Sequence, residues 1–361
     1  MKTFLYRSKG IPSLVLVSIA TLLILIYLSP GDKEKKDASS LEIKGNTIDV
    51  STFKVEDSDT EQFINATYYK DYYERECLLL PKIQVSEDDN RLPSCPFISG
   101  DTYRSFCHHV FDEHTSYLVY EHIAKRIKKN ELVFVATHML KHITNVLLQN
   151  VKEPFILITS NSDHSAPEPY QSLLNFDKLI AWFPQNADMI HEKVHPLPIG
   201  LANVIWGHGN IRLISEMSNK RKKFNERKTL LYINMKLETD GARAALENRF
   251  RDLNNVKILK NRIPYNQYLE DLIDSKFVLS PRGNGLDCHR TWEALVMGAI
   301  PIVLDSTMNA AFNNTSKVII LKSWDDLTQE VLEQYQPGPD TLPEIVYAKY
   351  WYDKIISHQI P

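Results

Sequence analysis

Several features that define common protein classes are scarce or missing in this sequence. It has four cysteines in 361 residues, too few for a disulfide-rich scaffold. It also has no excess of positive charge, because 42 Lys and Arg face 45 Asp and Glu for a formal net charge of -3. Nucleic-acid domains usually carry a strong basic excess, so general polyanion binding is excluded. The 43% hydrophobic and 24% charged residues are typical of a folded body, and the length allows two domains of ordinary size.

Metal-binding motifs are also missing. No Cys-x2-Cys pair occurs, and the stretch with His108, His109 and His114 has no matching second half, which argues against zinc. The one Asp-x-Asp pair is Asp57-Ser-Asp59, in a polar, charged segment. A solvated run of charge explains that pair better than a metal site, so no metal ligand is assigned.

The first thirty residues contain a long uncharged run, Ile11 to Leu28. At about 1.5 Å per residue a helix of this run would be about 27 Å long, enough for a thin bilayer. A cleaved signal peptide is the alternative, but its apolar part is usually about 7–15 residues and ends at a small-x-small site, which is missing here. We expect a cytoplasmic tail at 1–10 and a transmembrane signal anchor at 11–29.

Charge alone leaves the orientation of this anchor open. Three basic residues precede the run and three lysines follow it closely, so the positive-inside count is tied. Three N-glycosylation sequons, at Asn65, Asn313 and Asn314, lie on the C-terminal side. We therefore expect a single-pass type II protein of the Golgi or endoplasmic reticulum membrane with its body in the lumen.

A polar stretch separates this anchor from the body. Residues 31–61 mix acidic and basic side chains with little hydrophobic periodicity, so a flexible stem at about 30–70 is expected. Cys77, Cys95 and Cys107 cluster where the body begins. In an oxidising lumen one pair among them is expected, and the sequence leaves open which.

The body alternates short apolar runs with helical patterns, which indicates an α/β fold with parallel sheets. Two Rossmann-like halves facing a cleft are expected, at 71–220 and 221–361. A basic linker with Lys220 to Lys223 joins them, and it is interpreted as a solvated hinge. The expected strands are 131–136, 155–159, 179–183, 229–234, 256–259, 276–279, 302–304 and 318–321, and His195 to Gly200 closes the first half. The expected helices of the second half are 241–251, 265–275, 287–298 and 324–335.

The most informative segment is 277–304, a strand, a glycine-containing turn, a helix and a second strand. Gly283 and Gly285 permit a tight turn and the close approach of a ligand. Asp287 fits the N-cap of the helix and Gly298 its C-terminal stop. Ligands of such sheets bind beyond the carboxyl ends of the strands.

Polar residues of this segment fit an anionic ligand. On a helical wheel His289, Arg290 and Glu293 lie opposite the apolar face that packs on the sheet. Arg282 lies in the turn, where its guanidinium reaches a phosphate at the start of the helix, and Glu293 is placed to accept from ribose hydroxyls. The alternative is a plain surface ion pair between Arg290 and Glu293.

The segment resembles the C-terminal nucleotide-sugar site of exostosin-like glycosyltransferases. The matching residues are Pro281-Arg282-Gly283, Arg290, Glu293-Ala294-Leu295, Gly298 and Ile300 to Val303. The resemblance implies a GT-B enzyme whose first half holds the acceptor and whose second half holds the nucleotide sugar.

The resemblance also assigns roles. It implies that Arg282, Arg290 and Glu293 hold the diphosphate and nucleoside, with Gly283 and His289 beside them. It implies a metal-independent, inverting transfer without a bound cofactor, from a UDP-sugar sooner than a GDP-sugar, to a glycan or glycoprotein. A homo- or hetero-oligomer is left open.

Inversion by direct displacement needs a general base, which we expect at the carboxyl end of a first-half strand. The loop at Thr159 to Ser165 offers Asp163 as first candidate and His164 as second, and His138 is a third. Each of these has a plainer interpretation as a turn or structural residue.

Two other functions are left open. One is a non-catalytic luminal protein that binds a glycan or a partner enzyme, and the other is a fucosyltransferase-like enzyme that uses a GDP-sugar.

Overall fold

The computed structural model of this chain describes residues 41–43, 46–48, 91–259, 261 and 263–361. The chain divides into two compact units, 1–58 and 59–361. In the first unit, β1 (Leu41–Ile43) pairs with β2 (Asn46–Ile48) in antiparallel register, where the sequence pattern predicts no strands.

Several sequence-based expectations concern the N-terminal region. The apolar run 11–28, the Asp57-Ser-Asp59 pair, Asn65 and Cys77 lie outside the described residues. Among the residues that are described, no helix has the length and apolar character needed to cross a membrane.

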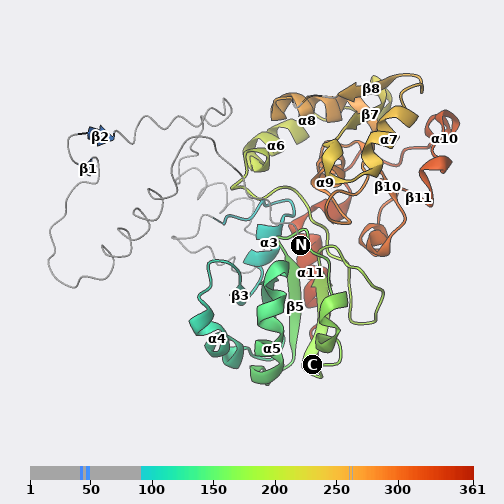
Figure 1. The fold of residues 1–361 in the computed structure, drawn as a ribbon. Helices are drawn as coiled ribbons and strands as arrows, with labels where there is room; N and C mark the ends of the chain where they lie inside the picture. Colours follow the sequence, from blue (N-terminus) through green and yellow to red (C-terminus); the bar gives the residue numbers. More distant parts are fainter. Residues whose placement is uncertain (1–40, 44–45, 49–90, 260, 262) are drawn as a thin grey trace. The chain divides into compact units, whose positions relative to one another are not determined.

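The first sheet of the second unit is parallel, with strand order β3-β4-β5-β6 (Figure 1). Its strands β4 (Glu131–Ala136), β5 (Phe155–Ser160) and β6 (Leu179–Pro184) confirm three predictions. β3 (His109–Phe111) was not predicted, because its His-Val-Phe sequence is too short to show a pattern. His195 to Gly200 forms only an isolated bridge, Gln185 with Leu197, and no strand.

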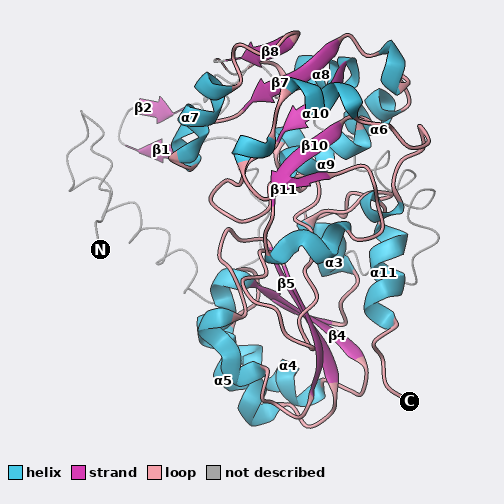
Figure 2. Cartoon of the chain, turned by 90° about the vertical axis from the view of Figure 1, so that its right-hand side faces the viewer, coloured by secondary structure: helices cyan, strands magenta, loops and turns pink. Residues whose placement is uncertain are grey.

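Alternation along the strands sends side chains to two covering layers. Leu132 and Phe134 of β4 join a core cluster with α3 (Gly100–Ser105) and α11 (Ala348–Ile356). Val133 and Val135 join another with α4 (Tyr120–Arg126) and α5 (Leu140–Asn150). Figure 2 shows these helix pairs on opposite sides of β4 and β5. Both faces are buried, which is why the strands are continuously apolar.

The second sheet is also parallel, in the order β11-β10-β9-β7-β8. Its core clusters place α8 and α9 on one face and α7 and α10 on the other. The strands are β7 (Thr229–Asn234), β8 (Val256–Leu259), β9 (Ser275–Leu279), β10 (Ile300–Leu304) and β11 (Ile319–Leu321), and the helices are α7 (Ala242–Arg249), α8 (Tyr265–Asp274), α9 (His289–Val296) and α10 (Gln329–Gln334). The predicted parallel α/β architecture is confirmed.

One predicted helix, 324–335, is divided. A 3-10 turn at Trp324–Asp326 is followed by α10, and Leu327 between them is extended. Thr328 then caps α10, since its side chain accepts from the Val331 N–H. The cap competes with a continuous helix, as Thr side chains do at such positions.

The remaining helices lie in the connections. α6 (Ile211–Ser218) precedes the basic linker. Short 3-10 helices occur at Tyr117–Val119, Thr137–Met139, Glu168–Leu173, Gly207–Gly209, Phe224–Glu226, Leu237–Thr239, Thr307–Phe312 and Glu344–Val346.

After the second sheet, the chain returns to the first. The Ile98 N–H donates to the Val346 carbonyl at 3.1 Å, and the Ala348 N–H donates to Pro96 at 2.8 Å. Trp351 of α11 is fully buried. The C-terminal helix therefore completes the core of the first half.

The cysteines of the described region differ in state. Cys95 is disulfide-bonded, whereas Cys107 and Cys288 are free thiols. Burial raises the pKa of the Cys107 thiol far above its ordinary value, which makes it unreactive.

A half-buried histidine of the first half, His195, which contacts the C-terminal segment, predicts how stability depends on pH. The His195 ring lies 5.0 Å from Phe183 and 4.2 Å from His358. Burial, followed by the charges of His358 and Lys354, lowers its pKa from 6.5 to about 4. The unfolded chain then binds more protons between these values, so stability is full above pH 6.5 and is lost as pH falls toward 4.

Replacing His195 with Gln is therefore expected to flatten the dependence of the unfolding free energy on pH in that window. Urea titrations between pH 4 and 7 measure it. His142→Gln, at an exposed position, serves as control and is expected to leave the slope unchanged. An unchanged slope in His195→Gln would contradict the assignment.

Candidate functional site

Residues that follow strands of the two sheets meet within the second unit. Asn284, in the turn after β9, donates from Nδ2 to Asp163 Oδ2 at 3.0 Å, and Asp163 follows β5. The Asp287 N–H donates to Asn186 Oδ1, after β6, at 3.1 Å. The carboxyl ends of both sheets, where ligands of parallel sheets bind, therefore converge on the turn 280–288.

Arg243 of α7 holds the backbone of this turn. Its Nε donates to the Arg282 carbonyl at 2.9 Å, Nη2 to Pro281 at 3.2 Å and Nη1 to Lys236 at 2.9 Å. The side chain is buried, with 4% of the residue exposed. Arg243 was not predicted as a site residue, because nothing in a helix rich in Ala, Glu and Arg distinguishes a buried arginine from a solvated one.

The glycines of the turn leave room for side chains of the protein itself to approach the backbone. A Cβ at Gly285 would lie 2.5 Å from the Asn186 side chain, and one at Gly283 would lie 3.1 Å from Arg243 Nη2. Glycine at 285 therefore admits a side chain of the first half, where the sequence analysis expected close approach of a ligand.

Positive charge gathers at the turn. Arg282 is exposed, and its Nε lies 3.8 Å from Asp240 Oδ2. Arg290 donates from Nε to the Asn234 carbonyl at 2.8 Å. Burial lowers the pKa of Arg243, and the charge of Arg290 lowers it further. Within the described residues, Arg243 and Arg290 form no ion pair, so an anion would relieve their mutual repulsion.

Glu293 differs from its expected position. The wheel places it away from the core, yet it is only 5% exposed, because α8 covers that side of α9. Its carboxylate accepts from the Tyr265 hydroxyl at 2.9 Å and the Tyr268 hydroxyl at 2.8 Å. Burial and the Glu293 charge raise the pKa of both tyrosines, so they remain donors. The alternative surface pair with Arg290 is not formed.

Asp287 is not the N-cap of α9, which is Cys288. Its buried carboxylate accepts from the Cys288 N–H at 2.8 Å, the Trp292 indole at 2.7 Å and the Ile199 N–H of the first half at 2.9 Å. Burial raises the pKa of Asp287, while these donors oppose the rise. Gly298, at φ +76, is the C-terminal stop as predicted.

Two other predicted residues lie beside this junction. His289 contacts the Gly200 carbonyl through Nδ1 at 2.8 Å, a bond that needs the Nδ1–H tautomer. His138 is half-buried in the turn after β4.

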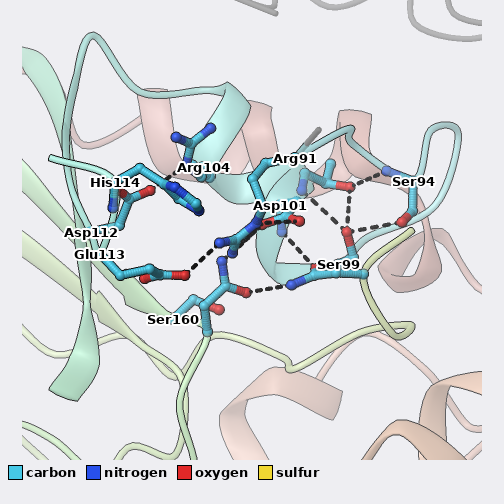
Figure 3. Close-up of polar contacts among 12 residues, drawn as sticks. Arg91, Ser94, Ser99, Asp101, Arg104, Asp112, Glu113, His114 and Ser160 are labelled. Atoms are coloured by element: carbon cyan, nitrogen blue, oxygen red, sulfur yellow. Dashed lines mark hydrogen bonds and ion pairs between the residues drawn. The ribbon is translucent and has the colours of Figure 1, made fainter. Parts of the chain in front are cut away.

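Asp163 and His164 are both exposed. Hydrogen bonds to a buried polar network hold the start of their loop, at Asn161. Asn161, at φ +58, donates from Nδ2 to Asp101 Oδ1 at 2.9 Å. Asp101 also accepts two bonds from Arg91, which reaches Glu113 at 2.6 Å. Figure 3 shows Arg91 between these two carboxylates. The network holds the start of the loop in place, while Asp163 and His164 at its tip are exposed.

The histidines considered as metal ligands and the asparagines of the C-terminal sequons lie in different surroundings. Within the described part of the chain, no group of three or more His, Cys, Asp or Glu is placed to hold a metal ion. His108 accepts from the Leu132 N–H and His109 pairs with Glu131 at 2.7 Å. Asn313 and Asn314 are exposed, and Asn314 donates to the Tyr350 hydroxyl at 2.7 Å.

Comparison with known proteins shows a similarity to one family model over part of the chain. Residues 225–336 match the model of the RXYLT1 C-terminal domain, an exostosin-like glycosyltransferase family. The match contains β7 to α10, and with them the turn and α9. No curated protein matches the chain.

Similar solved structures are distant. A trehalose 6-phosphate synthase from Burkholderia multivorans has 12% identity and a TM-score of 0.37, covering 67% of this chain and 75% of its own. A GtfA/B complex has 10% identity and a TM-score of 0.31, covering 67% and 57%. At such scores neither likeness bears on function.

The bonds of Asp287 predict a large effect of its removal. Asp287→Ala leaves the buried Trp292 indole without an acceptor, at a cost of about 1–3 kcal/mol. The part-buried N–H groups of Ile199 and Cys288 lose the same acceptor. We expect the free energy of unfolding to fall by about 2–3 kcal/mol, measured by urea titration. Asp252→Ala, at an exposed position, is the control, and equal losses in the two variants would refute the role of the Asp287 carboxylate.

Proposed function

We propose that this chain is a glycosyltransferase that moves a sugar from a nucleotide-sugar donor to a glycan or glycoprotein. The observation that carries the proposal is the 3.0 Å contact between Asn284 and Asp163. It brings the expected donor-binding turn and the expected base loop together. The match of residues 225–336 to an exostosin-like family supports the same activity.

The cations of the turn fit the donor. Arg282 is exposed and Arg290 faces no carboxylate partner among the described residues, so both are available to a diphosphate. Guanidinium groups bind phosphate oxygens in bidentate geometry. They stabilise the leaving diphosphate by charge and hydrogen bonds, which is the chemistry of a metal-independent transfer. Glu293 has remaining lone pairs for a ribose hydroxyl beside the two tyrosines.

Asp163 acts as the general base in this proposal. Its Oδ2 accepts from Asn284, and its carboxylate retains further lone pairs to take the proton of an acceptor hydroxyl. The hydroxyl attacks the anomeric carbon, the bond to the diphosphate breaks, and the configuration inverts. His164, the next residue, is the second candidate.

The compartment is part of the proposal. A signal anchor at 11–29 would place the body in the lumen of the Golgi or endoplasmic reticulum. The disulfide bond of Cys95 supports an oxidising compartment, and the exposed sequons at Asn313 and Asn314 agree with it.

Asp163→Asn is expected to separate transfer from donor binding. The amide cannot take a proton, so the transfer rate falls about 100-fold or more, while the thermal shift with the nucleotide is retained. A screen of UDP against GDP, followed by transfer from the matching sugar nucleotide, measures both quantities.

Two control variants separate loss of donor binding from loss of the general base. Arg282→Ala is expected to lose nucleotide binding, and His164→Ala to keep transfer if Asp163 is the base. Binding without turnover in the wild type would favour the non-catalytic alternative, and a response to GDP alone would favour the fucosyltransferase-like one. No response to any nucleotide would refute the proposal.

Glycosylation tests the luminal location. Asn313 has an exposed amide, whereas the Asn314 amide is engaged by Tyr350, so Asn313 is the expected acceptor. Asn313→Gln in cells is expected to remove one glycan, seen as a mobility shift on endoglycosidase treatment that is smaller by one glycan than in the wild type. Asn314→Gln keeps the Asn313 sequon and serves as control. A shift lost only in Asn314→Gln would reverse the assignment.

A further inference from the structure

A second basic site lies at the opposite end of α9 from the donor turn. A small pocket is lined by the end of α9 and by both segments that connect the two halves. Its charged lining residues are Arg221, Lys222, Arg227, Lys317 and Asp340. The basic linker, interpreted from sequence as a solvated hinge, is therefore partly folded into a pocket wall.

The charges of this pocket do not cancel. Lys222 is paired with Asp274. Arg221, Arg227 and Lys317 then share one lining carboxylate, Asp340, which also accepts from the Phe224 N–H at 3.2 Å. Three cations against one carboxylate leave an excess of two positive charges. Burial lowers the pKa of Arg221, Arg227 and Lys317, as expected for desolvated cations without full compensation.

Arg227 is the buried centre of the site. It is 4% exposed, and its two Nη groups donate to the carbonyls of Leu272, Ser275, Lys222 and Met297. Its Nε is buried and has no partner among the described residues. A buried guanidinium that meets only carbonyls and keeps one free donor is unusual, because buried charges are normally paired.

Gly298 provides the room for these arginines. A Cβ there would lie 2.5 Å from Arg227 Nη2 and 3.0 Å from Arg221 Cδ. The glycine that ends α9 thus leaves room for the Arg227 guanidinium and for the aliphatic part of the Arg221 side chain.

We propose that this pocket binds a doubly charged tetrahedral oxyanion, phosphate or sulfate, held by Arg221, Arg227 and Lys317. Such an anion matches the excess charge, and it offers oxygens to the free Nε–H of Arg227 and to the cationic side chains of Arg221 and Lys317. It would tie the linker before β7, which carries Arg221 and Arg227, to the segment before β11, which carries Lys317, and so fix the linker that joins the two halves. The inference does not depend on the proposed donor site.

Thermal unfolding of the full-length protein tests the site. Inorganic phosphate is titrated at constant ionic strength with sodium chloride, and the wild type is expected to show a saturable rise in Tm. Lys317→Gln and Arg221→Gln each remove one charged donor, so the half-saturating phosphate concentration is expected to rise about tenfold. Lys220→Gln, in the same linker but outside the pocket, is expected to leave it unchanged.

One further variant and one further ligand separate the alternatives. Phosphate also stabilises proteins without binding, and an equal, unsaturated rise in all variants would overturn the proposal. A saturable rise that Arg282→Ala abolishes and Lys317→Gln retains would place phosphate in the donor turn and overturn it too. With the pocket confirmed, tighter binding of a sugar 6-phosphate than of inorganic phosphate would identify a substituted sugar as the source, and the reverse order a free anion.

Discussion

The buried carboxylate of Asp287 is the interaction on which the site depends. It joins a backbone N–H of the first half, the first residue before α9 and the indole of Trp292. Because a buried carboxylate is costly without donors, each of these groups is held where the carboxylate needs it. The turn, the helix and the first half therefore share one geometry, and Arg290 and Glu293 are placed on that frame.

Positive charge in this protein is concentrated at the two ends of α9. The whole chain is nearly neutral, yet arginines gather at both ends of α9, three around the turn and two around Gly298. Backbone carbonyls accept from several of them, and this keeps the guanidinium groups in place without neutralising them. Local excess of this kind attracts small anions and leaves the surface free of a general affinity for polyanions.

The sheets were largely predictable from sequence, whereas the detailed site was not. Strands such as 131–136 and 229–234 are apolar runs of the right length, and a parallel sheet buried on both faces requires that pattern. The turn and Gly298 carry local signals as well. Arg243, Asn186 and the tyrosines above Glu293 come from elements far away in sequence, so only the tertiary structure brings them to the site. The strand β3, at 109–111, was not predicted, because three residues are too few to show an alternating or apolar pattern.

Because the C-terminal segment returns to the first sheet, one hydrophobic core extends beyond the stretch that matches a family model. One core cluster contains Phe97, Trp292 and Trp351, from before, within and after the stretch that matches a family. That stretch, 225–336, is the part of the chain that a family model matches. Its helices α8 and α9 complete their packing on residues outside it, so the stretch alone lacks part of its own hydrophobic core. The stretch that matches a family model and the set of residues that share one hydrophobic core therefore have different boundaries.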